Sequence, residues 1–180
     1  MALLSSAVVC AATWTQANDA IAHPSSIDRP EDAGFDVQLT GRIKDNCQLK
    51  GGGTLALGEI VGQKTVNAGF DLNCNVPFAV DVTSLRGGLA HATHPQGEGP
   101  FAGTATYRLN LYIPTLSPTP STLHAAFDST QLRSGTSVSS GEAIAAGGGR
   151  IEVKLNEVIG AGLLAGDYSE SLIITVSQRL

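Results

Sequence analysis

Short runs of strictly alternating apolar and polar residues constrain the fold of this chain more than any other feature of its sequence. In residues 35–43 the side chains of Phe35, Val37, Leu39 and Ile43 point to one face and the polar side chains to the other. The same period of two returns in segments 54–60, 66–74, 78–82, 104–113, 151–155 and 168–178. No window shows a convincing helical period, although residues 123–127 and 142–146 could each form a single turn. We therefore predict an all-β sandwich or barrel of about seven strands.

Two long stretches lack this alternation and are predicted to be irregular. Residues 86–103 are rich in Gly and His, and residues 114–140 in Pro, Ser and Thr. The triple glycines at 51–53 and 147–149 precede predicted strands and not helices, so they are interpreted as hairpin or linker glycines and not as phosphate-binding loops.

The composition favours a protein whose surface packs against other protein molecules and argues against a nucleic-acid binder. Charged residues make up 15% of the 180 residues, the net charge is −5, and the eleven basic residues are scattered singly. Binding to phosphates draws on clustered Lys and Arg. Sparse charge together with 21 glycines suits a surface that packs against copies of itself.

The first 22 residues are predicted to be a signal peptide. An apolar run over residues 3–13 has the length of such a leader's core, and Ala20-Ile21-Ala22 fits its cleavage site. The run is too short to span a bilayer, and no basic residue precedes it, so a buried N-terminal helix is the alternative. Residues 23–34 are predicted to be a flexible tail, and residues 35–180 are predicted to form one exported domain.

The cysteines support export. Cys10 lies in the leader, which leaves Cys47 and Cys74 in the mature chain. An even number of cysteines in a secreted protein indicates a disulfide, here one that joins Cys47 to Cys74. Two buried free thiols or half of a metal site are the alternatives, but no Cys-x-x-Cys motif or Cys/His cluster supports a metal.

The two ends of the domain suggest a way for copies of it to join. The last segment, in which Leu172, Ile174 and Val176 share a face, runs almost to the C-terminus, so it is expected to leave an edge without a neighbour. The first segment, residues 35–43, lies outside the disulfide loop and is free to leave. It is either a strand that is donated to another copy or simply the first strand of its own sheet; the pattern alone favours neither.

Several of these segments, taken in order, resemble the spore coat protein U-like family, which includes pilins of the archaic chaperone–usher type. The resemblance covers residues 35–180, about four-fifths of the chain. It rests on an alternating strand that leads to a cysteine (FDVQLTGRIKDNCQL), a Leu-Gly strand (TLALGEI) and a second cysteine after a strand (FDLNC). A Gly-rich loop, the segment YRLNLY and the closing segment LLAGDYSESLIITVS complete it.

This resemblance implies an incomplete immunoglobulin-like sandwich that lacks its last strand. A periplasmic chaperone would lend the missing strand, and the N-terminal segment of the next subunit would later replace it at an outer-membrane usher. Residues 35–43 would then be the donor strand, with Cys47 and Cys74 as the disulfide. The strand beside the groove would carry Tyr168, Leu172, Ile174 and Val176. The chain is thus expected to be a structural subunit of a surface fibre that acts in adhesion and biofilm formation.

No residue pattern predicts catalysis, a cofactor or a metal site. His91 and His94 lie close in sequence, but no carboxylate or cysteine at ligand spacing completes a set, and these two and His124 are interpreted as surface histidines. Asp167 and Glu170 are interpreted as turn and solvent-facing residues and not as an acid/base pair. The main rival to a fibre subunit is a monomeric secreted binding module for a glycan or another surface ligand, and an enzyme comes third.

Overall fold

The computed structural model describes residues 38–179. The chain divides into two units, residues 1–41 and 42–180, and every strand of the described part lies in the second. This part contains eleven strands and one short 3-10 helix, η1 (Gln131–Ser134), and no α-helix. The prediction of an all-β fold is confirmed, while its immunoglobulin-like character stays a prediction.

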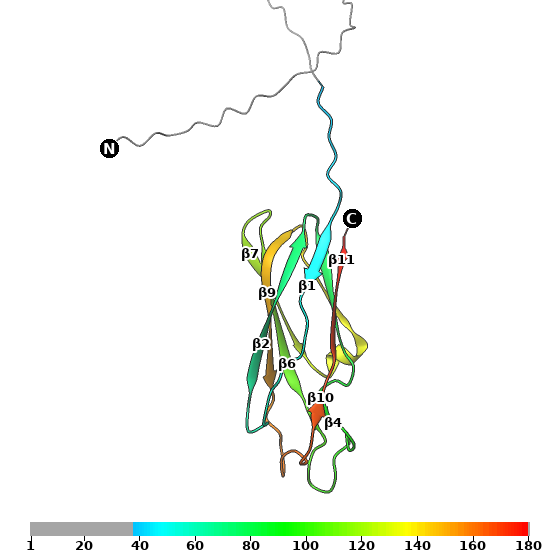
Figure 1. Ribbon diagram of the computed structural model, residues 1–180, viewed down its shortest axis with the longest axis vertical. Coiled ribbons are helices and arrows are strands. Elements are labelled where there is room, and N and C mark those ends of the chain that lie inside the picture. The colour runs from blue at the N-terminus through cyan, green and yellow to red at the C-terminus, as the bar shows by residue number, and fades with distance from the viewer. Residues whose placement is uncertain (1–37, 180) are drawn as a thin grey trace, which may run out of the picture. The chain divides into compact units, whose positions relative to one another are not determined.

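The strands form three antiparallel groups (Figure 1). The largest is a five-stranded sheet in the order β1 (Cys47–Lys50), β2 (Thr65–Cys74), β9 (Ala145–Leu155), β6 (Tyr107–Thr115) and β7 (Ser121–Asp128). A second sheet has the order β11 (Leu172–Gln178), β3 (Phe78–Ser84) and β8 (Thr136–Ser139). A third has the order β10 (Tyr168–Ser169), β4 (Leu89–His91) and β5 (Thr104–Ala105).

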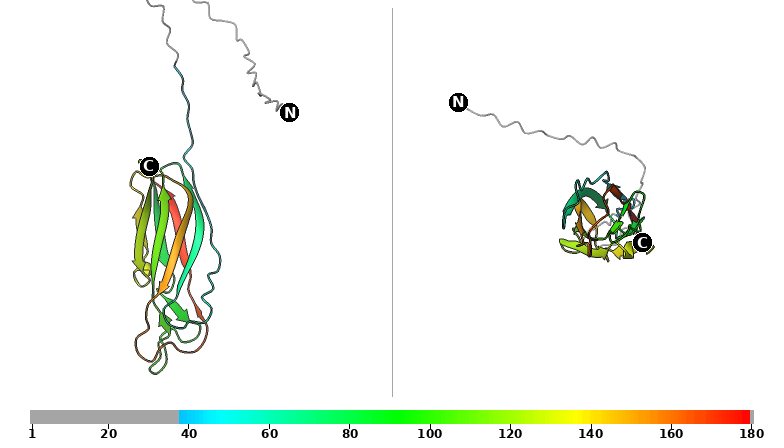
Figure 2. Two further views of the ribbon diagram at one scale, coloured as in Figure 1. Left: turned by 90° about the vertical axis from the view of Figure 1, so that its left-hand side faces the viewer. Right: turned by 90° about the horizontal axis from the view of Figure 1, so that it is seen from below.

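The core lies between the five-stranded sheet and the sheet that contains β3, and Figure 2 shows these strands from two further sides. Alternate residues of β6 point inward, so Leu109, Leu111 and Ile113 are at most 1% exposed. On β3, Phe78 and Val82 are fully buried in the same way. A period of two with one buried face is what the sequence predicts for these two strands.

Three predictions about irregular segments are wrong. Residues 86–103 contain the short strand β4, which pairs with β10 and β5. Residues 114–140, which the sequence predicts to be irregular, contain β7, η1 and β8. β7 pairs with β6 over eight residues, and its inward side chains Leu123, Ala125 and Phe127 lie where the sequence allows a helical turn. The alternation is weak there because alanines on both faces provide little contrast. β8, in turn, pairs with β3 from Thr136 to Ser139.

The second triple glycine is part of a strand and not a linker. Gly147, Gly148 and Gly149 lie inside β9 and pair with β2. Gly149 is opposite Phe70, and a Cβ atom at Gly149 would overlap the Phe70 ring. Gly149 therefore leaves room on the sheet for the Phe70 ring, because the Cβ atom of any other residue would occupy that space.

Candidate functional site

A groove of about 1360 Å³ lies beside β11, the last strand of the described chain. One wall is formed by the five-stranded sheet and residues 51–60, and the other by residues 163–174, which include β10 and the start of β11. The lining is more apolar than polar, and its apolar side chains include Leu55, Leu57, Val66, Phe70, Ile151, Val153, Leu172 and Ile174. The groove thus presents a row of apolar side chains, which a chain in an extended conformation could cover.

β11 has a hydrogen-bonding partner on only one side within the described residues. It pairs with β3 over the seven residues from Leu172 to Gln178, and no described strand pairs with its other edge. Leu172, Ile174 and Val176 alternate inward as predicted but are only half-buried, whereas their neighbour Val80 on β3 is 1% exposed. The core is therefore less completely covered at this edge than at its centre.

Three of the four predicted groove-edge residues line the groove. Leu172 and Ile174 do so from β11. Tyr168 does so from β10, a separate short strand that pairs with β4. Val176 is not among the lining residues, although it packs against the hydrophobic core.

The opposite wall contains a segment that the sequence predicts to be a strand and that is not one. Residues 54–60 alternate in sequence, and Leu55, Leu57 and Ile60 are half-buried, yet the described residues offer their backbone no strand partner. β1 ends at Lys50, and Gly51 follows with φ +153°, where a Cβ atom would come within 2.7 Å of the Phe70 Cβ. Leu57 and Ile60 pack against the hydrophobic core, and the Lys64 Nζ donates a hydrogen bond to the Leu57 carbonyl at 2.9 Å.

The predicted donor segment falls only partly within the described residues. Phe35 and Val37 lie outside them. Leu39 and Ile43 are 89% and 85% exposed and belong to no strand. The assignment of residues 35–43 as a donor strand stays a prediction.

The two cysteines of the domain lie directly opposite each other. Cys47 begins β1, Cys74 ends β2, and the two pair in register with their Cα atoms 4.0 Å apart. They are thus a pair at disulfide distance, as the cysteine count predicts. The link joins the first residue of the edge strand β1 to the neighbouring strand of the sheet.

Near one end of the groove, a carboxylate replaces missing main-chain partners. β3 pairs with β11, and β4, which follows β3 in the chain, pairs with β10, which precedes β11. Residues 85–88, between β3 and β4, interrupt this pairing. Glu170 accepts hydrogen bonds from the Arg86 and Gly88 amides at 3.1 and 2.9 Å and from the Ser84 hydroxyl at 2.9 Å. Glu170 therefore has a structural role where the strand pairing is interrupted, in addition to lining the groove.

Tyr107 contributes to the groove from the start of β6 and is 1% exposed. Its hydroxyl is buried and has no hydrogen-bond partner of acceptable geometry among the described residues. The hydroxyl of Ser84 lies beside it but already donates to Glu170 and accepts from the Gly87 amide. Burial raises the pKa of the Tyr107 phenol to about 12.

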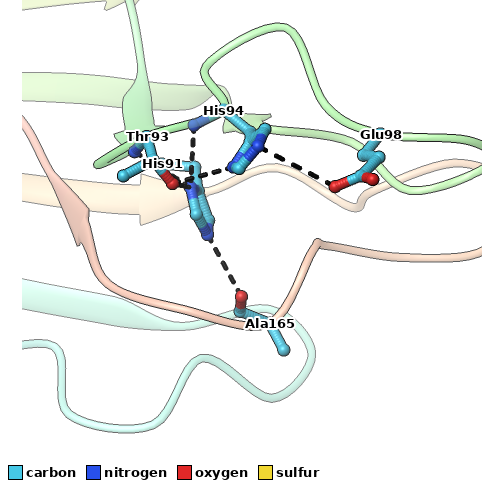
Figure 3. A network of polar contacts seen from close by, with 5 residues as sticks. All are labelled: His91, Thr93, His94, Glu98 and Ala165. Carbon is cyan, nitrogen blue, oxygen red and sulfur yellow. Dashed lines mark hydrogen bonds and ion pairs between the residues drawn. The ribbon is translucent and has the colours of Figure 1, made fainter.

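The histidines near the groove form a structural contact and not a ligand set (Figure 3). The sequence interpretation of His91 as a surface residue is wrong, because its side chain is 7% exposed. Its Nδ1 accepts the main-chain N–H groups of Thr93 and His94 at 3.2 and 3.0 Å, so its Nε2 carries the proton and donates to the Ala165 carbonyl at 3.1 Å. Both ring nitrogens are therefore occupied. Across residues 38–179, no group of three His, Cys, Asp or Glu side chains could hold a metal ion.

One aromatic ring on the outer face of the five-stranded sheet packs against side chains from both neighbouring strands. Tyr112 pairs with His124 on β7 and with Arg150 on β9, which flank β6 on opposite sides. The His124 ring stacks on it at 4.6 Å and the Arg150 guanidinium lies 4.5 Å from its centroid. The Tyr112 ring is thus already engaged by two side chains of its own sheet.

The fold and the groove define this protein as an all-β domain built from antiparallel sheets, with an apolar groove at one edge. Comparisons with protein-family models, with curated proteins and with solved structures find no significant match to the chain. No helix in the described part of the chain is long and apolar enough to cross a membrane.

Proposed function

We propose that this chain is a structural subunit of a bacterial surface fibre and that its copies join by strand exchange. Residues 35–43 of one copy would fill the groove of the next. The observation that carries this proposal is the apolar groove beside a strand, β11, whose outer edge has no partner in the described chain. Edges of this kind pair readily with a strand from another molecule.

The proposed donor segment matches the groove in its pattern of apolar side chains. Residues 35–43 carry four large apolar side chains on one face, and the start of β11 lines the groove with Leu172 and Ile174. Two of those side chains, Leu39 and Ile43, are almost fully exposed, so they gain from being covered. Each large apolar side chain that becomes buried contributes roughly 1.5–3 kcal/mol.

The resemblance to the spore coat protein U-like family supports the same proposal. Together with the leader-like N-terminus, it supports export to the cell surface, with a periplasmic chaperone and an outer-membrane usher as transient partners. In this reading the domain is an immunoglobulin-like sandwich that lacks its last strand, and the fibre serves adhesion and biofilm formation. The protein would not be an enzyme and would need no cofactor.

Two single substitutions in the donor segment test the proposal. Leu39→Asp would place an unpaired charge in an apolar pocket, which burial cannot offset. Gln38→Asp introduces the same charge one residue away, on the face that points to solvent. At matched levels of subunit, we expect the Leu39 variant to be exported but to form no fibres, and the Gln38 variant to form them normally.

Three outcomes would contradict the proposal. Equal assembly by both variants would mean that residues 35–43 do not enter a groove. Loss of soluble protein in the Leu39→Asp variant alone would mean that this segment belongs to the core of its own domain. A stable, soluble Leu39 variant that still binds surface ligands as a monomer would favour the secreted binding module instead.

A further inference from the structure

Two connections between strands meet at one end of the described domain. Residues 92–103 join β4 to β5, and residues 156–167 join β9 to β10. They are hydrogen-bonded to each other: the Ala102 main-chain N–H donates to the Gly162 carbonyl, and the Leu164 N–H donates to the Ala102 carbonyl, both at 2.9 Å. We call these two connections the tip, and Figure 1 shows the tip beyond β4 and β10.

The tip presents large apolar side chains on a hydrogen-bonded main chain. Glu98 and Phe101 exchange two main-chain hydrogen bonds of 3.1 Å around a turn of Gly99 and Pro100, and Gly99 has the positive φ of +55° that tight turns of this kind favour. Phe101 is 42% exposed, and Ile159 in the second connection is 93% exposed. Apolar side chains on an ordered main chain lose little conformational entropy when a partner covers them. The tip is therefore suited to a contact with another protein molecule.

The tip lies at the opposite end of the domain from the start of β1. Cys47, the first residue of β1, pairs with Cys74, and Cys74 pairs with Ala145, the first residue of β9. β9 runs away from there over eleven residues to Leu155, where the second connection of the tip begins. A strand of this length spans roughly 35 Å. The chain before β1 thus leaves the domain at the end that is remote from the tip.

The tip also adjoins the groove. Leu163 and Leu164 belong to the tip and line the groove, and β11 lines it with its first residues, Leu172 to Ile174. β11 runs away from the tip, because its last residue pairs with Phe78 at the start of β3. The named strands of the described domain all pair antiparallel. A segment that pairs with β11 in the same way runs toward the tip, so the domain that follows this segment comes to lie against the tip.

The chain just before β1 and the tip have complementary charges. Arg42 and Lys44 are exposed and outnumber the one acidic residue beside them, Asp45. The Asn75 side chain donates to the Lys44 carbonyl at 2.9 Å and so holds this part of the chain at the start of β1. The tip contains no Lys or Arg and three exposed acidic residues: Glu98, Glu157 and Asp167. Opposite charges on two surfaces favour their encounter and help to fix their register.

We propose that the tip of one copy docks against residues 42–46 and the adjoining end of the domain in the next copy, with Phe101 and Ile159 at the centre of the contact. This inference rests on the proposed function: strand exchange brings the next copy to the groove, and the tip fixes how the two domains are oriented. Successive copies are then related head to tail, and a contact of this type can repeat along a fibre without closing into a ring.

The first test separates docking at the tip from filling of the groove. A full chain that carries Phe101→Ser and Ile159→Ser is compared with Leu85→Ser, a matched control that is 63% exposed and lies in neither the tip nor the groove lining. We expect the subunit concentration at half-assembly, measured by sedimentation, to rise roughly tenfold for the tip variant and less than twofold for the control. In a Leu39→Asp background, a peptide of residues 35–43 should bind equally well with either tip, because the peptide carries no domain that could dock.

The second test uses the charges. Changing Glu98 and Glu157 to Lys should weaken assembly at low salt, and changing Arg42 and Lys44 to Glu should do the same. A chain that carries all four changes restores the opposite charges and should assemble as the parent does.

Three results would overturn the inference. Assembly that the serine substitutions leave unchanged would show that the tip does not dock. Weaker peptide binding by the serine variant would show that the tip merely maintains the groove. Charge reversals that do not compensate each other would show that the tip and residues 42–46 do not meet. Failure of the peptide to bind the Leu39→Asp chain with its natural tip would instead contradict the proposed function.

Discussion

At the scale of single residues, the buried hydroxyl of Tyr107 links the groove to the stability of the domain. Its pKa is raised from 10.0 to about 12 by burial. The folded state therefore holds the phenol proton more tightly than the unfolded state does, and stability falls as the pH rises from 10 to 12. Two units of pKa correspond to about 2.7 kcal/mol, an upper value for this contribution.

Replacing Tyr107 with Phe should remove this part of the alkaline sensitivity. Near pH 7 we expect Tyr107→Phe to change the free energy of unfolding by less than about 1 kcal/mol, because the hydroxyl has no partner to lose. Between pH 10 and pH 12 the variant should lose less stability than the parent, as measured by urea unfolding at each pH. Tyr112→Phe, on the outer face of the sheet, is the control. Parallel losses in parent and Tyr107 variant would contradict the assignment.

Which polar residues matter could not be predicted from the sequence. Asn75, Glu170 and His91 form hydrogen bonds to groups that are far away in the sequence: Asn75 to residues 44 and 46, Glu170 to residues 84, 86 and 88, and His91 to the carbonyl of residue 165. No local spacing encodes such contacts. The apolar alternation of β11 was predictable, by contrast, because a period of two can be recognised from consecutive residues alone.

At the scale of elements, the sequence predicted strands wherever large side chains alternate and failed where pairing depends on context. Residues 54–60 alternate clearly but form no strand, because no described strand pairs with their backbone. Residues 121–128 alternate weakly but form β7, because β6 offers them a complete edge. Strand formation is thus decided by the neighbour as much as by the segment itself.

At this scale, removal of the link between β1 and β2 should lower the free energy of unfolding most. A disulfide between Cys47 and Cys74 closes a loop with a sequence separation of 27. In the chain-entropy model such a loop contributes about 3.5 kcal/mol. Thiol titration of the unfolded, unreduced chain should find neither cysteine reactive once the leader with Cys10 is removed. Changing both cysteines to serine should lower the urea midpoint accordingly; two reactive thiols in the parent would refute the bond.

At the scale of the whole molecule, the uncovered groove should decide how the protein behaves on its own. Leu172 and Ile174 are half-buried and expose apolar surface, and the outer edge of β11, which no described strand pairs with, exposes main-chain groups beside them. Such surfaces promote association. We therefore expect the domain, produced without a chaperone, to elute as oligomers or aggregates.

Adding the missing strand in trans should reverse this behaviour. If a peptide of residues 35–43 covers the groove of the Leu39→Asp chain, it binds the folded state alone and raises the melting temperature with peptide concentration. A hundredfold excess over the dissociation constant would stabilise the fold by about 2.7 kcal/mol. The same peptide with Leu39→Asp is the control and should have no effect, because its charge would have to enter the apolar groove without a partner. If the Leu39→Asp chain is a stable monomer whose melting temperature neither peptide changes, its groove needs no strand, and assembly by strand exchange is ruled out.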